Sequence, residues 1–168
     1  LTLVANTSLG DLISVTESYV SLLNLTISYV VDEVGSANAI NIKGDDTITD
    51  IYVLDSDIYF ESHTTKDNYV VTAINIDDVE DVYVDGCNIV ANMPSLTVGS
   101  YDFTYFMMGL SYVNPIRIYE ASTSELTNNN IEVIVNSYDS SFPTVQALYI
   151  VGSDDVLAMS FLTFFNSE

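Results

Sequence analysis

Paired aspartates at two matched places in the sequence are the first candidates for chemistry. Asp45-Asp46 and Asp77-Asp78 each follow a short run of alternating apolar residues. Carboxylates are the ligands that Ca²⁺ prefers, and two of them about 5 to 9.5 Å apart are the catalytic groups of glycoside hydrolases. Aspartate is also common in turns, because its side chain hydrogen-bonds its own backbone. We therefore expect no cofactor. Two alternatives remain: a structural calcium ion bound by these four aspartates, or a hydrolase pair formed by Asp46 and Asp78.

The single cysteine and the single histidine do not form a pair of nucleophile and base. Cys87 occupies the turn position that Ser56 holds one repeat earlier, and His63 lies in a loop of that earlier repeat. A thiol needs a neighbouring base to act as a nucleophile, so we interpret Cys87 as a small packing residue. One cysteine also excludes a disulfide within the chain. We predict no catalytic residue.

A polysaccharide lyase needs a basic residue beside a calcium site. The candidate base is Arg117, the only arginine or lysine on an expected strand. The neighbouring outward positions hold Asn75 and Tyr149, which are not carboxylates. The sequence therefore disfavours a lyase.

Tyrosine is abundant, with 12 residues and no tryptophan. Tyr52 and Tyr83 occupy the same outward position in successive repeats, so we expect their rings to stack. The insertion 93–114 carries two further aromatic candidates, Tyr101 and Tyr105. Aromatic rings bind sugars, but they also cover apolar surface. These four tyrosines are the ligand-binding candidates, with covering of the sheet as the structural alternative.

The charge of the chain limits its partners. The formal net charge is −21, from 24 acidic residues against three basic ones. Nucleic acids and anionic membranes attract Lys and Arg, so both are disfavoured as partners. The longest apolar runs, such as 105–110, are far shorter than the roughly 20 residues of a membrane-spanning helix. We expect no membrane contact within this segment.

Repeats of a few tens of residues organise the sequence. Each repeat opens with a short alternating run, and the copies begin Ala39-Ile40-Asn41-Ile42, Ala73-Ile74-Asn75-Ile76, Pro115-Ile116-Arg117-Ile118 and Ala147-Leu148-Tyr149-Ile150. Alternation with a period of two is typical of half-buried strands. Equivalent strands recur once per repeat and must stack in parallel on their copies. The sequence predicts an all-β fold, a right-handed parallel β-helix of about five coils with three short strands per coil.

One spacing supports the repeat, because an apolar residue that ends the second strand lies five residues before one in the third. The pairs are Val15 and Val20, Val53 and Ile58, Val84 and Ile89, Leu126 and Ile131, and Met159 and Phe164. A helical pattern of apolar residues is found only in one short candidate segment, at 9–15.

Loops of variable length follow the third strand, at 32–38, 61–68, 92–114 and 137–144. Insertions gathered at one corner of a solenoid often form its binding face.

The pattern from Ala73 to Ile89 resembles the β-helix repeats of archaeal adhesin-like surface proteins of methanogens, within the wider pectate-lyase-like superfamily. The resemblance implies an extracellular, cell-surface stalk or adhesion region. Two sequons, at Asn6 and Asn24, suit such a protein as glycosylation sites. The absence of an initiator methionine and of polar caps leads us to expect one β-helix segment, residues 1–168, excised from a longer surface protein.

We therefore expect a non-catalytic module for cell adhesion, whose partners are a cell-surface glycan or protein, or copies of itself. A polysaccharide lyase or hydrolase on the same scaffold is the first alternative. A self-assembling surface filament or sheath subunit, stacking through open strand edges, is the second.

Overall fold

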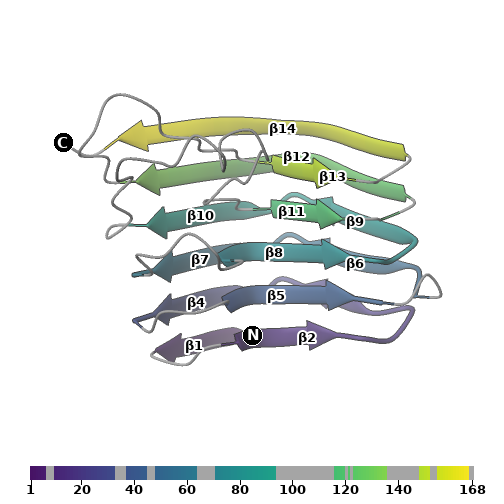
Figure 1. Cartoon of the computed structure of the whole chain (residues 1–168), viewed down its shortest axis with the longest axis horizontal. Coiled ribbons are helices and arrows are strands. Elements are labelled where there is room, and N and C mark those ends of the chain that lie inside the picture. Colours follow the sequence, from purple (N-terminus) through teal and green to yellow (C-terminus); the bar gives the residue numbers. More distant parts are fainter. Residues whose placement is uncertain are drawn as a thin grey trace, which may run out of the picture.

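A computed structural model shows an all-β protein, with parallel strands in a curled sheet (Figure 1). The structure describes residues 1–6, 10–32, 37–44, 48–63, 71–93, 116–119, 121, 123–135, 148–151 and 155–166. Within these ranges there is no helix, and hence none long and apolar enough to cross a membrane.

The strands are short except for β12 and β14, which have 13 and 12 residues. They are β1 Thr2–Asn6, β2 Gly10–Val15, β3 Ser21–Leu23, β4 Thr26–Val31, β5 Ala37–Lys43, β6 Ile51–Leu54, β7 Asp57–Ser62, β8 Val71–Asp77, β9 Asp81–Asp85, β10 Asn88–Met93, β11 Ile116–Tyr119, β12 Thr123–Val135, β13 Leu148–Val151 and β14 Asp155–Asn166.

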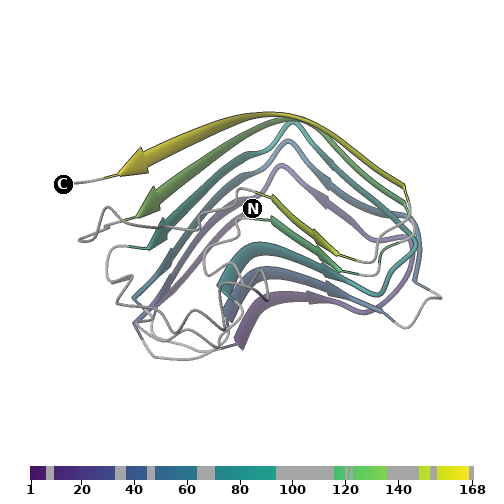
Figure 2. The same cartoon turned by 45° about the horizontal axis from the view of Figure 1, so that its top comes forward.

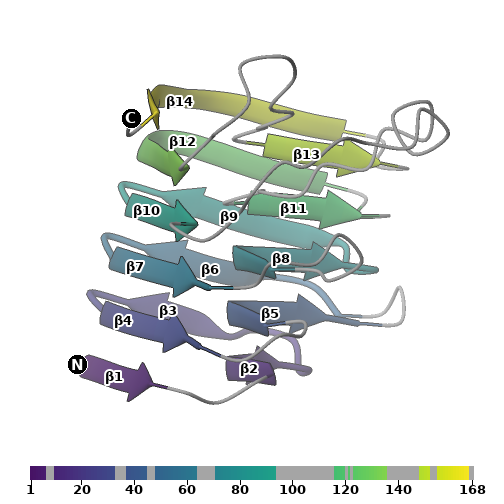
Figure 3. The ribbon, with the colours of Figure 1, turned by 60° about the vertical axis from the view of Figure 1, so that its left-hand side comes forward.

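The strands lie in three columns, in which each strand pairs in parallel with its copies. The first column is the five-stranded sheet β13-β11-β8-β5-β2. The second column is β3, β6 and β9, and the third is β1, β4, β7 and β10; both columns continue into β12, whose two halves pair with β9 and β10. The result is five layers, which are β2–β4, β5–β7, β8–β10, β11–β12 and β13–β14, with β1 beneath the first (Figure 3). Figure 2 shows that successive layers follow the same curled path.

The predicted stacking of equivalent residues is confirmed in the first column. Ile42 pairs with Ile76, Ile76 with Ile118, and Ile118 with Ile150. The side chains of Ile42 and Ile76 are fully buried. Because alternate residues of a strand point to opposite faces, this register places one aliphatic position of each layer on the same inner face.

The third column has the same kind of interior. Ile27, Ile58, Ile89 and Ile131 are paired in register from layer to layer, and each is 1% exposed or less. Two residues further along, the rings of Tyr29 and Phe60 lie 5.8 Å apart at an interplanar angle of 59°, a tilted contact within the usual distance of aromatic pairs. Aliphatic and aromatic contacts between layers therefore hold the stack together.

The corner between the second and third columns repeats an unusual backbone conformation. Asn24, Asp55, Gly86 and Asn128 occupy equivalent positions, and all have positive φ, between 49° and 66°. Asn, Asp and Gly are the residues that adopt this conformation most readily. The N–H groups of Asn24, Asp55 and Gly86 donate to carbonyl groups of the next layer at 3.0 to 3.1 Å. These corner residues thus bend the chain, and the N–H groups of Asn24, Asp55 and Gly86 keep their hydrogen bonds between layers.

Two of the predicted residue pairs are wrong. The equivalents of Val53 and Ile58 in the first layer are Leu22 and Ile27, which are also five residues apart, while Val15 lies in the first column beside Ile42. In the last layer, Leu126 pairs with Ala158 and Ile131 with Leu162, so the expected pair of Met159 and Phe164 is out of register. The register of β12 and β14 shifts between Thr127 and Asn130, which shortens the spacing by one residue.

The secondary structure also differs from prediction at two places. Residues 10–15 of the possible helix form strand β2. In the fourth and fifth layers, the second and third strands are continuous through the corner as β12 and β14, so these layers have two strands instead of three. The backbone still bends at this corner within β12, where Asn128 has φ 54°.

Candidate functional site

The acidic turns do not form a cation site among the residues that the structure describes. Asp45 and Asp46 lie outside those residues, so their distance from Asp77 and Asp78 stays a prediction. Asp77 ends β8, and its carboxylate is 3.7 Å from the Lys43 ammonium. Asp78 follows with φ 58°, a turn conformation. Over the described ranges, no group of three or more His, Cys, Asp or Glu side chains has the arrangement of a metal site.

The predicted stack of tyrosines is confirmed. The rings of Tyr52 and Tyr83 lie 4.9 Å apart with an interplanar angle of 10°. Their Cα atoms are paired across β6 and β9, and both side chains are partly exposed on the outer face of the second column. Each ring covers one face of the other, so the pair is not a flat platform of two coplanar rings. Tyr101 and Tyr105 lie outside the described residues.

Cys87 is a packing residue. Its side chain is 2% exposed, and its thiol lies 3.5 Å from the carbonyl oxygens of Val53 and Asp85. Burial raises the pKa of Cys87 to about 11, with the nearby aspartates adding to the effect. The thiol is therefore protonated at neutral pH and is a poor nucleophile.

The structure also gives the positions of the two glycosylation candidates, Asn6 and Asn24, and of Arg117. Asn24 is exposed at the corner between β3 and β4, where a glycan would be accessible. Asn6 ends β1. Arg117 of β11 pairs with Asn75 and Tyr149, as expected, and its side chain lies outside the described residues.

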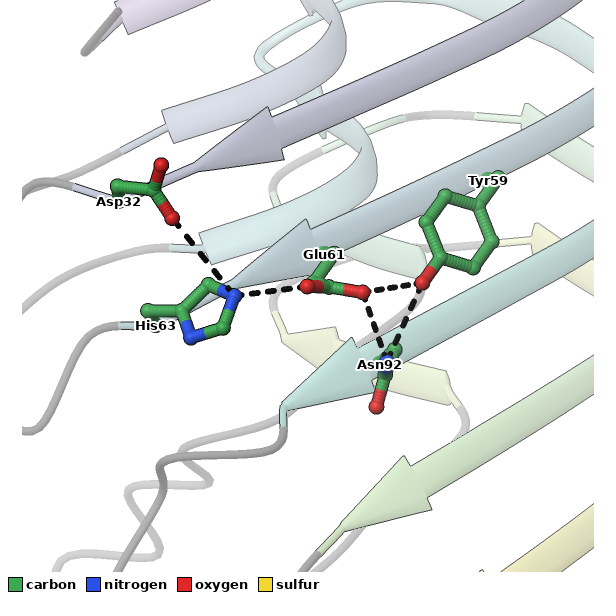
Figure 4. A network of polar contacts seen from close by, with 5 residues as sticks. All are labelled: Asp32, Tyr59, Glu61, His63 and Asn92. Atoms are coloured by element: carbon green, nitrogen blue, oxygen red, sulfur yellow. Dashed lines mark hydrogen bonds and ion pairs between the residues drawn. The ribbon is translucent and has the colours of Figure 1, made fainter. Parts of the chain in front are cut away.

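A polar network at the end of the third column is the most developed group of titratable side chains among the described residues (Figure 4). Alternation along β7 buries Ile58 and Phe60 and leaves Tyr59 and Glu61 on the outer face. Asn92 of β10 is the register partner of Glu61, which places their side chains next to each other. His63 follows β7, and its N–H donates to the Val31 carbonyl at 2.9 Å. The network therefore draws on three layers.

Glu61 is the centre of this network. Its Oε2 accepts hydrogen bonds from the Tyr59 hydroxyl and from Asn92 Nδ2, the latter at 2.8 Å. Asn92 Nδ2 also lies 3.2 Å from the Tyr59 hydroxyl oxygen. The other carboxylate oxygen, Oε1, is 2.7 Å from His63 Nε2, which is itself 3.7 Å from Asp32 Oδ1. Both oxygens of Glu61 thus have partners.

The contacts set the protonation of the network. Burial by itself raises the pKa of Glu61, but the hydrogen bonds from Tyr59, His63 and Asn92 outweigh it and hold the pKa below its ordinary value. Burial, together with the hydrogen bond to Glu61, raises the pKa of Tyr59. At neutral pH the pair is therefore a carboxylate and a neutral phenol. A carboxylate held ionised in this way accepts hydrogen bonds well and is a poor general acid.

Glu61, His63 and Asn92 lie in the loops that the sequence predicts at 61–68 and 92–114, and no sequence motif connects them. A signal was present, because Glu61 lies three residues after Ile58 and Asn92 three after Ile89. Equal distance from paired residues predicts lateral contact in a parallel stack. The alternation of β7 continues to Glu61 and Ser62, so the strand extends further than expected.

Comparison of the chain with known proteins gives no match to a family model, to a curated protein or to a solved structure.

Proposed function

We propose that this chain is a non-catalytic, extracellular adhesin-like module built as a right-handed parallel β-helix. The layers form a stiff stalk, and the loops after the third strands are presented to a glycan or protein on another surface. Right-handed connections between parallel strands of one sheet occur in about 98% of cases, which supports the handedness.

The observation that carries the proposal is the contrast between the inner and outer positions of the columns. Inner positions repeat one chemistry, as Ile27, Ile58, Ile89 and Ile131 do. The outer positions beside them change from layer to layer, from Ser28 through Tyr59 and Val90 to Glu132. A repeated interior with a variable exterior is the arrangement of repeat proteins that bind through extended surfaces.

The polar network supports a binding role over a catalytic one. The partners of Glu61 lower its pKa, whereas the acid of a glycoside hydrolase needs a raised pKa. The buried Cys87 thiol has a raised pKa and is no nucleophile at neutral pH. One observation favours an enzyme: the carboxylates of Asp32 and Glu61 both lie near the His63 imidazole.

A binding and turnover experiment tests the proposal. The labelled protein is applied to a glycan array and to intact cells, and in parallel it is incubated with polygalacturonate and neutral polysaccharides. We expect saturable binding without product. Release of reducing sugar or unsaturated product that Glu61→Gln abolishes would overturn the proposal in favour of the enzyme.

A second candidate function, assembly into a filament, has one observation in its favour. The exposed large apolar side chains among the described residues all belong to β1 and the first layer: Leu1, Val4, Tyr19 and Leu23. Strand edges of β1, β2 and β3 lie at the same end of the stack (Figure 3). Open strand edges pair with further strands, and a head-to-tail contact does not close.

Light scattering over a range of protein concentrations distinguishes the two functions. A stalk that is not a filament stays at the mass of one chain. A filament gives elongated particles whose mass grows with concentration, and Val4→Lys and Leu23→Lys should shorten them.

A further inference from the structure

The outer face of the second column joins an aromatic centre to an acidic rim. We call it the tyrosine face, and its centre is Tyr52 and Tyr83 with Leu54 beside them. The carboxylates of Asp50, Asp81 and Glu125 surround this centre, and their charges, after burial, contribute to raising the pKa of Tyr83. An apolar centre with a charged rim is the arrangement of a protein-binding surface.

The ring stack covers only one face of Tyr83. Tyr52 covers one side of Tyr83. The opposite side of the Tyr83 ring is turned toward β12, because the strand order is β6-β9-β12. On β12 the register partner of Tyr83 is Glu125, in the neighbouring layer about 4.8 Å away. A group bound over the outer part of this ring face, beyond the Glu125 carboxylate, therefore meets a π face and a carboxylate together.

The negative charge of this face is not balanced by a described cation. Lys43, the one lysine or arginine side chain that the structure describes, lies on the first column beside Asp77. One hydroxyl contacts the rim: Thr49 Oγ1 lies 3.0 Å from an Asp81 carboxylate oxygen and 3.3 Å from one of Asp50, and these two acceptors share its single proton. These bonds orient the carboxylates and leave their charge in place. A partner with positive charge is thus complementary to the face.

We propose that the tyrosine face binds a basic segment of a partner protein, with an arginine guanidinium stacked on Tyr83 and paired with Glu125. A guanidinium is planar, so it stacks on an aromatic ring while its N–H groups bind a carboxylate in the same plane. A lysine ammonium is also attracted to the ring and the carboxylate, but it is not planar and cannot stack on the ring. The inference rests on the proposed adhesion function and adds to it a second binding surface, apart from the loops after the third strands.

Peptide binding tests the inference. The whole 168-residue chain is titrated with two fluorescent peptides, one with three arginines spaced by glycine and one with three lysines in the same positions, at about 0.15 M salt. We expect the arginine peptide to bind at least about threefold more tightly than the lysine peptide. Tyr83→Ala and Glu125→Gln should each weaken the arginine peptide about threefold or more, while Tyr83→Phe retains the ring and the affinity.

Glu132→Gln is the matched control, because it removes the same charge from an outer position of the same strand, in the third column. Equal weakening by Glu132→Gln and Glu125→Gln, or equal affinity for both peptides, would show only attraction by the net charge and would overturn the inference. Binding of a neutral glycan that Tyr83→Ala abolishes would also overturn it, while leaving the adhesion function in place. Circular dichroism of each variant checks that it is folded.

Discussion

The inner and outer faces of strand β7 follow different rules. Ile58, Phe60 and Ser62 are buried on one face, and Ile58 is one of a column of isoleucines of the same chemistry. Tyr59 and Glu61, on the other face of the same strand, lie in columns whose residues differ from layer to layer. Inner side chains share one environment, because each is covered by the layers above and below. Outer side chains meet solvent and local neighbours, so they are free to acquire function.

The largest expected effect is at an inner position. Ile58→Ala should lower the free energy of unfolding by about 2 to 5 kcal/mol, because it leaves a cavity between two layers. Tyr59→Ala, one residue away on the outer face, should cost about 1 kcal/mol. Urea denaturation measures both values. Similar losses at the two positions would mean that the faces do not differ in the way proposed here.

A second comparison concerns two buried serines on the inner side. The Ser56 hydroxyl accepts the Leu25 N–H at 3.1 Å and donates to the Leu54 carbonyl at 2.8 Å, so Ser56→Ala should cost about 1 to 2 kcal/mol. The Ser124 hydroxyl is fully buried and has no hydrogen-bond partner among the residues that the structure describes; it lies beside Val82 in the register. Ser124→Val should therefore stabilise the protein by about 1 kcal/mol.

Thermal unfolding of the two serine variants gives the answer directly, because the melting temperature should fall for Ser56→Ala and rise for Ser124→Val. A drop for both would show that the Ser124 hydroxyl is satisfied in solution, for instance by water.

The outer polar network should make stability depend on pH. The folded state lowers the pKa of Glu61 from its ordinary value of 4.5, so Glu61 stabilises the fold above that value and loses this contribution as the pH falls through its folded pKa. At neutral pH, Glu61→Gln should be less stable than the wild type by about 1 kcal/mol. The difference should shrink on acidification. Tyr59→Phe, which removes one of the hydrogen bonds, should show a smaller effect of the same form.

Denaturation curves from neutral to acidic pH measure this dependence. A Glu61→Gln deficit that is the same at every pH would indicate lost packing and not a lost charge.

The smallest effect on stability is expected at Cys87. Cys87→Ser should change the free energy of unfolding by about 1 kcal/mol or less, because Ser56 fills the equivalent position one layer away. With its pKa raised to about 11, the native thiol should react with a disulfide reagent at mildly alkaline pH far more slowly than in denaturant. Equal rates in the two states would contradict the burial of this side chain.

The sequence by itself determined the parallel stacking and the repeated apolar positions. Alternation and a repeat period are local properties, so Ile42, Ile76, Ile118 and Ile150 were aligned from their spacing and pair as predicted. The stack of Tyr52 on Tyr83 and the packing role of Cys87 follow from the same alignment.

Only the tertiary structure determined the strand register in the first and last layers and the contacts of the outer polar network. In the first and last layers the spacing is compatible with more than one register, and pairing with the neighbouring layer selected Leu22 over Val15 and Ala158 over Met159. The contacts of Glu61 with Asn92, His63 and Asp32 join residues of three layers. No local pattern encodes them, because they depend on where strands end and how side chains turn once the layers are packed.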